Sequence, residues 1–76
     1  MPFLYVPETM AYGKERRKFI KDWFNANPDG QYHVNRKYRP QVKNDSDLKK
    51  LIRTGFLKQI RGHIWRGHGY SYLVKA

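Results

Sequence analysis

The absence of cysteine is the strongest constraint on how this chain can fold. At 76 residues the chain has the size of one small domain, and small domains bury a lower fraction of their surface than large ones. Without disulfides or thiolate-bound metals, such a domain depends on a single apolar core built from helix and strand faces. Disulfide scaffolds, zinc fingers and cysteine nucleophiles are therefore excluded. A hydrophobic content of 39%, with 16% aromatic residues, predicts a folded chain.

The positive charge of the chain is concentrated in its second half. The formal net charge is +10, and residues 36–66 hold ten basic residues against two acidic ones, a net +8. Residues 1–35 hold five basic and four acidic residues, a net +1. A basic excess of this size favours a polyanionic partner, and a phosphate polymer is the first candidate. An anionic membrane surface is disfavoured, because the basic helices are short and their apolar faces are needed for the core.

The first predicted helix covers residues 12–25. Four apolar residues recur there at helical spacing and span about 140° of the helical wheel; they are Phe19, Ile20, Trp23 and Phe24. We expect this arc to face the core, and the basic residues on the opposite side to be solvated; these are Lys14, Arg17, Lys18 and Lys21. Asn27 before Pro28, followed by a turn dipeptide, predicts that the helix ends near residues 25–28.

Residues 31–42 carry a mixed signal. We predict a short strand over residues 31–34 and a short second helix over residues 35–42. Val34, Tyr38 and Val42 recur at the spacing of a helix face. Pro40 opposes that prediction, because it would remove a helical hydrogen bond and clash with the preceding turn.

The third predicted helix has both of its ends marked in the sequence. Asn44, Asp45 and Ser46 offer capping oxygens, Asp47 places negative charge in the first turn, and Gly55 ends the helix. The apolar stripe consists of Leu48, Leu51 and Ile52. The opposite basic arc consists of Lys49, Lys50 and Arg53. The helix therefore has one apolar and one wholly basic face.

The remaining residues predict a β-hairpin over residues 56–74. Both arms are rich in aliphatic and aromatic residues, which suit a half-buried pleated surface. Gly67 and Gly69 provide the conformational freedom for the turn between the arms. Arg66 and His68 are expected at its tip.

The sequence DLKKLIRTGFLKQIRGHIWRGHGYSYLV, a capped basic helix followed by a glycine and a hairpin, resembles the recognition helix and wing of winged helix-turn-helix proteins. The resemblance covers roughly residues 12–74. It implies an α+β fold, a small winged-helix domain over residues 12–76 with three helices and a C-terminal β-hairpin wing, preceded by an N-terminal arm over residues 1–11. Pro40 departs from the pattern, because it lies inside the expected second helix.

The resemblance implies binding of double-stranded DNA by a small transcriptional regulator or accessory protein, with the third helix in the major groove and the hairpin on an adjacent groove or the backbone. The expected contact residues are Lys43, Asn44, Ser46, Lys49, Lys50, Arg53, Arg61, Trp65, Arg66 and His68. Lysines suit phosphate, whereas the planar fork of Arg53 also suits guanine. Thr54 and free backbone amides at the start of the helix would add phosphate contacts. Trp65 either stacks on the nucleic acid or packs under the hairpin.

Other functions remain open. An RNA-binding or ribosome-binding module suits the aromatic residues interleaved with basic ones; these are Tyr32, Tyr38, Tyr70, Tyr72 and Trp65. A protein-protein adaptor acting on a polymerase suits the segment PFLYVP, which either adds to a partner's sheet or covers this domain's own core. A small ribonuclease is the least favoured, because no carboxylate cluster accompanies His63 and His68.

We therefore expect no enzymatic activity, no cofactor and no metal. His33, His63 and His68 form no recognised ligand spacing and are expected to be polar surface residues. The opening apolar run of four residues is too short for a signal-peptide core or a membrane span. We expect a cytoplasmic protein, nucleoid-associated or otherwise intracellular, that is a monomer or weak dimer.

Overall fold

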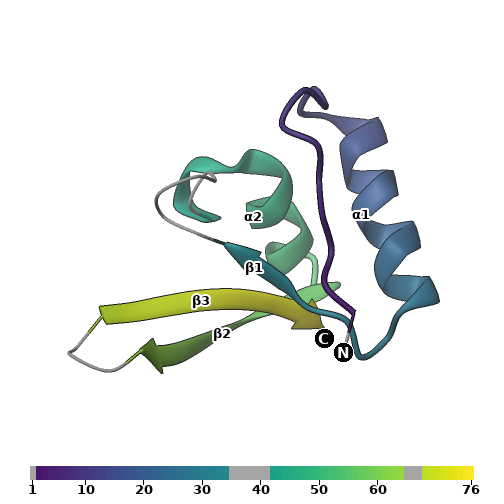
Figure 1. Cartoon of the computed structure of the whole chain (residues 1–76). Coiled ribbons are helices and arrows are strands. Elements are labelled where there is room, and N and C mark those ends of the chain that lie inside the picture. Colours follow the sequence, from purple (N-terminus) through teal and green to yellow (C-terminus); the bar gives the residue numbers. More distant parts are fainter. Residues whose placement is uncertain (1, 35–41, 65–67) are drawn as a thin grey trace.

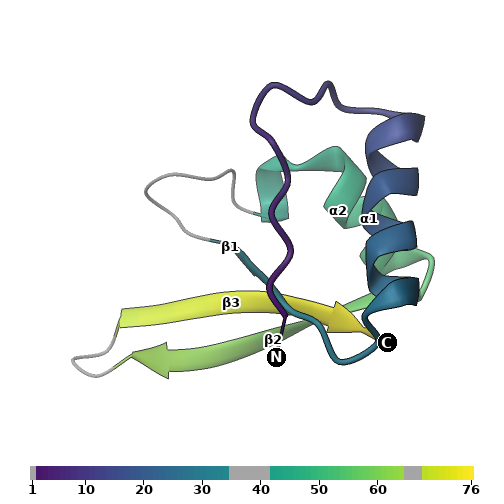
Figure 2. The same cartoon turned by 45° about the vertical axis from the view of Figure 1, so that its right-hand side comes forward.

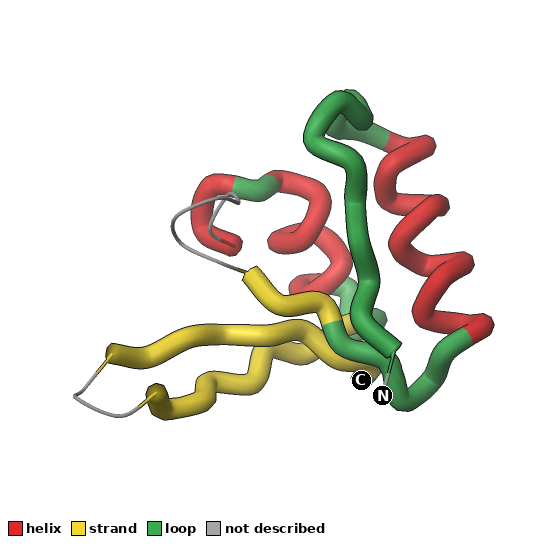
Figure 3. The backbone as a smooth tube through the Cα atoms, viewed as in Figure 1, coloured by secondary structure: helices red, strands yellow, loops and turns green. Residues whose placement is uncertain are grey.

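The computed structural model describes residues 2–34, 42–64 and 68–76, with the backbone alone described for residues 34, 43, 61–64 and 68–71. Within these residues the elements are α1 (Lys14–Ala26), β1 (Tyr32–Val34), the 3-10 turn η1 (Val42–Asn44), α2 (Ser46–Arg53), β2 (Leu57–Ile64) and β3 (His68–Lys75). Figure 1 shows them in sequence colours, and Figure 3 separates helices, strands and loops.

The three strands form one antiparallel sheet in the order β1-β3-β2, so β3 is the central strand. The β2–β3 hairpin pairs without interruption up to Ile64, which lies opposite His68. On the other side of β3, Tyr32 of β1 lies opposite Leu73. Both α-helices lie over the same face of this sheet, and the end of the hairpin projects beyond them (Figures 1 and 2).

The core lies between that face of the sheet and the helices. Its buried side chains are Ile20 and Phe24 of α1, Leu48 and Leu51 of α2, Tyr32, Leu57 and Leu73 of the sheet, and Leu4 and Val6 of the N-terminal segment. Spacings of four residues in α1 and three in α2 place each helical pair on one stripe. The strand residues reach the same core because alternate side chains of a strand point to the same face.

The N-terminal segment belongs to this packing unit. The backbone N–H of Leu4 donates to the carbonyl of Gln31 at 2.8 Å, and the N–H of Gln31 donates to the carbonyl of Pro2 at 3.0 Å. Phe3 forms a parallel bridge with Gln31, just before β1. In Figure 1 the segment then runs between α2 and α1, and its residues Leu4 and Val6 are buried. Of the two roles left open for this segment, the structure shows that it covers the domain's own core.

Both predicted ends of α2 are confirmed. Asp45 is its N-cap, and Oδ1 of that side chain accepts from the N–H groups of Asp47 and Leu48, each at 3.1 Å. Gly55 has φ 84°, a left-handed conformation that glycine adopts without steric cost. The Gly55 N–H donates to the carbonyl of Ile52 and the Phe56 N–H to that of Leu51, both at 3.0 Å. This pair of hydrogen bonds is the Schellman motif, which ends a helix.

The prediction of three helices is wrong. The described residues contain two α-helices, and the fold is a small α+β structure with a three-stranded antiparallel sheet. The expected second helix lies outside the described residues except for its last position, Val42, which belongs to η1. The Asp45 N–H closes that single turn by donating to the Val42 carbonyl at 3.0 Å. Asp45 itself is extended, with φ −117° and ψ 103°, so the turn cannot run on into α2.

The core-facing arc of α1 is also rotated relative to the prediction. Phe19 was expected in the core but is 38% exposed, whereas Arg16 is buried beside Ile20 and Phe24. Residues 16, 20 and 24 follow one another at steps of four and so form one stripe, from which Phe19 lies about 100° away. The arc was misplaced because a charged residue was not expected among the buried positions.

Candidate nucleic-acid interface

The solvent-facing side of α2 is a basic stripe. Ser46, Lys49, Lys50 and Arg53 are all exposed and follow the spacing i, i+3, i+4, i+7, which places them on one side of the helix. Leu48 and Leu51 are buried on the side that faces the core. The two-faced helix predicted from the sequence is therefore confirmed. We call these four exposed residues the α2 stripe.

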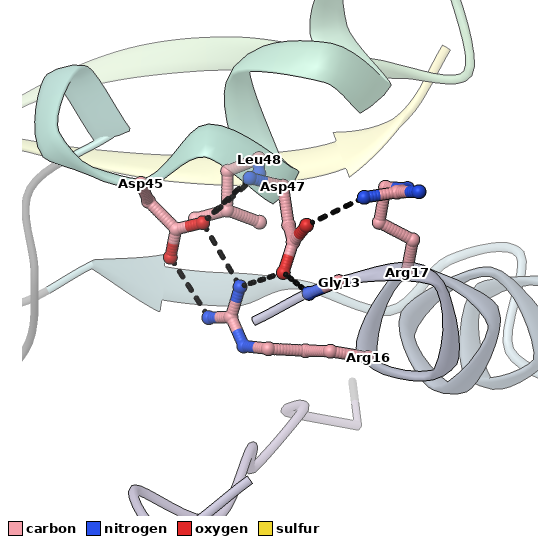
Figure 4. A network of polar contacts seen from close by, with 6 residues as sticks. All are labelled: Gly13, Arg16, Arg17, Asp45, Asp47 and Leu48. Atoms are coloured by element: carbon pink, nitrogen blue, oxygen red, sulfur yellow. Dashed lines mark hydrogen bonds and ion pairs between the residues drawn. The ribbon is translucent and has the colours of Figure 1, made fainter. Parts of the chain in front are cut away.

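The N-terminal end of α2 is held by a cluster of buried charges (Figure 4). The guanidinium of Arg16 donates from Nη1 and Nη2 to the two carboxylate oxygens of Asp45, at 2.9 and 2.8 Å, and from Nη1 to Asp47 at 3.0 Å. Arg17 donates to the other oxygen of Asp47 at 3.0 Å. The backbone N–H of Gly13 donates to Asp47 at 3.0 Å. We call these residues, Gly13, Arg16, Arg17, Asp45 and Asp47, the charge cluster.

Gly13 has a backbone conformation that the charge cluster requires. Its φ is 137°, in a region that residues with a side chain rarely adopt, and it is the N-cap position of α1. This conformation accompanies an N–H group that points at Asp47 (Figure 4). The start of α1 and the start of α2 are thereby joined by one carboxylate.

Burial and hydrogen bonding shift the pKa values of Arg16 and Asp47 in opposite directions. Arg16 is 4% exposed, and Asp45 and Asp47 are each 1% exposed. Burial works to raise the pKa of Asp47, but hydrogen bonds from Gly13, Arg16 and Arg17 outweigh it, so this pKa lies below its ordinary value. Burial works to lower the pKa of Arg16, and the hydrogen bonds with Asp45 and Asp47 outweigh it, so this pKa is raised. The side chains of Arg16 and Asp47 are therefore both charged at neutral pH.

The segment that contains α2, residues 36–66, has no acidic residue outside the charge cluster. Asp45 and Asp47 are the only acidic residues between residues 36 and 66, and both are occupied by arginines of α1. No carboxylate of that segment is therefore left to pair with the α2 stripe. The net +8 found in the sequence lies on a segment whose two negative charges are buried.

The prediction of free backbone amides at the start of α2 is wrong. The Asp47 and Leu48 N–H groups donate to the side chain of Asp45, so they are already occupied. A capping carboxylate and an incoming phosphate would use the same donors, and two further carboxylate oxygens nearby would repel the phosphate. Thr54 is also less suited than expected, because its hydroxyl donates to the Lys50 carbonyl at 3.0 Å.

The structure places the other predicted contact residues at two locations. Asn44 is exposed at the end of η1, next to the α2 stripe, and Lys43 precedes it in the same turn. Arg61 lies on β2 opposite Ser71, and His68 begins β3, in the last pair before the hairpin loop. Trp65 and Arg66 lie outside the described residues. α2 and the hairpin end are thus two separate parts of the predicted interface.

The basic side of α1 is exposed at Lys14, Lys18 and Lys21, as predicted, and differs from the prediction at Arg17. Arg17 belongs to the charge cluster, and Lys18 pairs with Asp22 at 2.6 Å on the surface. Lys21 lies over the ring of Phe56, at 5.5 Å from its centroid. Sequence analysis missed Arg16 altogether, although its position four residues before Ile20 was the signal that could have identified it.

The aromatic residues considered for stacking are not equivalent. Tyr32 is 3% exposed and belongs to the core, so it cannot stack on a ligand. Tyr72 lies on the opposite face of the sheet, where its ring stacks on His33 with centroids 5.1 Å apart. His33 is therefore part of an aromatic contact rather than an isolated polar surface residue. Tyr38 lies outside the described residues.

No helix in the described ranges combines the length and apolar character needed to cross a bilayer. No group of three His, Cys, Asp or Glu residues in the same ranges is arranged to hold a metal ion.

Comparison with known proteins adds no assignment. No protein-family model, curated protein or solved structure matches this chain. The resemblance to winged helix-turn-helix proteins therefore stays a prediction that rests on the residues quoted above.

Proposed function

We propose that this chain binds double-stranded DNA through the α2 stripe, as a small transcriptional regulator or accessory DNA-binding protein. The observation that carries the proposal is the exposure of Lys49, Lys50 and Arg53 on one side of a helix whose neighbouring carboxylates are both buried in ion pairs. Phosphate contacts supply most of the electrostatic affinity for DNA, and exposed basic side chains make them.

The dimensions of α2 support this role. An α-helix with its side chains is about 10–12 Å across, which fits the major groove with its width of about 12 Å. Lys49 and Lys50 lie beside each other as point charges suited to phosphates. Arg53, one turn further along, carries the planar fork that binds the O6 and N7 atoms of guanine. In this arrangement the lysines position the helix and Arg53 reads a base.

The hairpin supplies the second contact in the proposal. The paired strands β2 and β3 project beyond the helices (Figure 2), and the contact residues proposed for the hairpin are Arg61, Trp65, Arg66 and His68. Lys43, Asn44 and Ser46 extend the first contact at the start of α2. A function of this kind requires the protein to reach DNA, so we include a nucleoid-associated location in the proposal.

The salt dependence of duplex binding tests this proposal. The triple variant Lys49→Gln, Lys50→Gln, Arg53→Gln should bind duplex DNA far more weakly than the parent chain. Each lost phosphate contact reduces the slope of log K against log salt by about 0.9, so the slope should fall by about 2 to 3. Fluorescence anisotropy of a labelled duplex over a range of salt concentrations measures both quantities.

The control is a second triple variant that removes the same charge from α1. Lys14, Lys18 and Lys21 are suitable, because none of them belongs to the charge cluster, whereas Arg17 does. This control should retain most of the duplex affinity. Equal losses in the two variants would show that only the total charge matters, and a larger loss in the α1 variant would assign the contact to α1; either result contradicts the proposal.

A further inference from the structure

The sheet has a second face, which carries an aromatic row. Strand side chains alternate between faces, and Leu73 and Tyr32 point into the core, so their neighbours Tyr72 and His33 lie on the face away from the helices. The rings of His33 and Tyr72 stack with an interplanar angle of 16° and centroids 5.1 Å apart. The ring of Phe3 meets His33 edge-on, with centroids 5.0 Å apart. Three rings from three segments thus form one continuous row.

The aromatic row is accessible at its edge. Phe3 is 65% exposed, although it is apolar and directly precedes the core residue Leu4. Ile60 lies opposite Tyr72 in the β2–β3 pairing and is only partly buried. Neither α1 nor α2 covers this face, since both lie on the other side of the sheet (Figures 1 and 2). A large exposed apolar ring beside two others is typical of an interaction surface.

The charge of the sheet indicates which kind of ligand would bind to this face. None of the six Asp and Glu residues of the chain lies in β1, β2 or β3. The strands carry Lys58, Arg61 and Lys75 in addition to three histidines, and the exposed Lys58 precedes Ile60 on the same face by two residues. A sheet with basic residues, no acids and an aromatic row matches a ligand that combines negative charge with flat rings.

We propose that this outer face of the sheet binds unpaired bases of a single-stranded nucleic acid, by stacking on Phe3 and Tyr72 with phosphates near Lys58. Aromatic rings on a sheet stack on bases of any sequence, because every base has a π face. Paired bases inside a duplex do not expose that face, so the ligand must be unpaired. DNA and RNA single strands share this chemistry.

This contact is independent of the duplex contact proposed for α2. The core lies between α2 and the sheet, and the α2 stripe and the aromatic row point away from it in different directions. A single-stranded ligand on the sheet therefore leaves the α2 stripe open. The geometry suits a chain that holds duplex and unpaired segments at the same time, as at a junction between them.

Ring-specific substitutions test the proposal. The probe is a fluorescein-labelled oligothymidylate of about 12 nucleotides, within the range of known single-strand site sizes, and an oligouridylate of the same length separates RNA from DNA. Phe3→Leu and Tyr72→Leu each replace a ring by an aliphatic side chain. Each should raise the dissociation constant about fivefold or more, the lower end of the loss expected for one stacked base. Phe3→Trp keeps a stacking ring and should bind as tightly as the parent chain.

The matched control is Phe19→Leu, the same substitution at an exposed ring on α1. It should leave single-strand binding unchanged. Circular dichroism checks that each variant is folded; if Tyr72→Leu is not, Phe3→Leu and Phe3→Trp still decide the matter, because Phe3 is largely exposed. Binding of either oligonucleotide that depends on these rings supports the inference.

Three outcomes would overturn it. The first is unchanged single-strand affinity in both ring variants. The second is a loss of single-strand affinity only in the α2 triple variant, which would leave the duplex proposal standing and assign both ligands to α2. The third is ring-dependent binding of an oligoglutamate peptide as tight as that of the oligonucleotides, which would show recognition of an acidic protein segment. If the parent chain does not bind duplex DNA but shows ring-dependent single-strand binding, the proposed function is contradicted and this inference is supported.

Discussion

Arg16 is the residue on which the packing of the two helices depends. It occupies a core position of α1, yet it satisfies four carboxylate oxygens together with Arg17 and Gly13. No buried side-chain nitrogen or oxygen in the described part of the chain lacks a hydrogen-bond partner. Tyr12 lies over the guanidinium, with its ring centroid 4.5 Å from Cζ. Removing one member of such a buried set leaves an uncompensated charge, which typically costs about 3–5 kcal/mol.

Acid should weaken the fold through Asp47. Because the pKa of Asp47 is lowered in the folded state, the carboxylate stabilises the fold above the pKa of the unfolded chain, and this contribution is lost as pH falls through the folded pKa. The free energy of unfolding of the parent chain, measured with urea, should stay level from about pH 7 to 5 and decline below about pH 4.

The variant Asp47→Asn isolates this effect. It should be less stable than the parent chain at pH 7, and the difference between the two should shrink as the pH falls below about 4, because the variant has no carboxylate to protonate at this position. General acid effects, such as repulsion among the many basic residues, act on both chains. Parallel curves for the two chains over this range would contradict the assignment.

At the scale of the element, α2 is stabilised both by residues adjacent to it in the sequence and by contacts with the rest of the fold. Its caps are formed by neighbours in the sequence, Asp45 at the start and Gly55 at the end. With only eight residues it is too short to be stable alone, because isolated helices of this length are marginal in water. The contacts of Leu48 and Leu51 with the core and of Asp45 and Asp47 with α1 therefore hold it in place.

The substitution of glycine by alanine at position 55, which adds one methyl group, tests the C-terminal cap of α2. Gly55→Ala should destabilise the fold by about 1–2 kcal/mol, because an L-residue pays this cost in the left-handed conformation. For a domain of this size the melting temperature should fall by roughly 4–8 °C per kcal/mol. Nothing lies within 4 Å of the added Cβ, so the effect reports backbone conformation rather than a clash.

Thr54→Ala is the matched control for that experiment. Thr54 directly precedes Gly55 but has an ordinary helical conformation, φ −82° and ψ −1°, and it is exposed. Its replacement should change the free energy of unfolding by no more than about 0.5 kcal/mol. Equal effects of the two substitutions would show that the left-handed position is not what ends the helix.

At the scale of the whole molecule, charge is sorted between the two halves of the chain. The arginines of α1 pair with both acids of the second half, Asp45 and Asp47, which lie buried beside the start of α2. The exposed basic residues include Lys49, Lys50 and Arg53 of α2 and Lys58 of β2. The ion pairs that hold the helices together thus also keep these two carboxylates away from the positive surface on which both proposed contacts depend.

The N-terminal segment should be needed for the fold of the whole molecule. Leu4 is 2% exposed and lies in the core, so Leu4→Ala should cost about 2–5 kcal/mol, the usual range for such a cavity. A domain of 76 residues has a total stability of only about 4–11 kcal/mol. The loss should therefore lower the urea midpoint strongly.

Tyr5→Ala supplies the comparison, since Tyr5 is the next residue and is 65% exposed. Its effect on the urea midpoint should be much smaller than that of Leu4→Ala. If both substitutions have the same small effect, the segment is not part of the core, and residues 12–76 would then be sufficient for folding.

The sequence by itself determined the features that depend on neighbouring residues. The caps of α2, its basic and apolar sides, the hairpin and the end of α1 near Asn27 all follow from local spacing and backbone preference. Only the tertiary structure decided which segments meet. Three features join residues that are distant in the chain. They are the ion pairs of buried Arg16 with Asp45 and Asp47, the packing of Leu4 and Val6 in the core, and the row of Phe3, His33 and Tyr72. A periodic pattern records which side of an element is apolar, but a buried charge becomes favourable only when its partner arrives from another element, and no local pattern contains that partner.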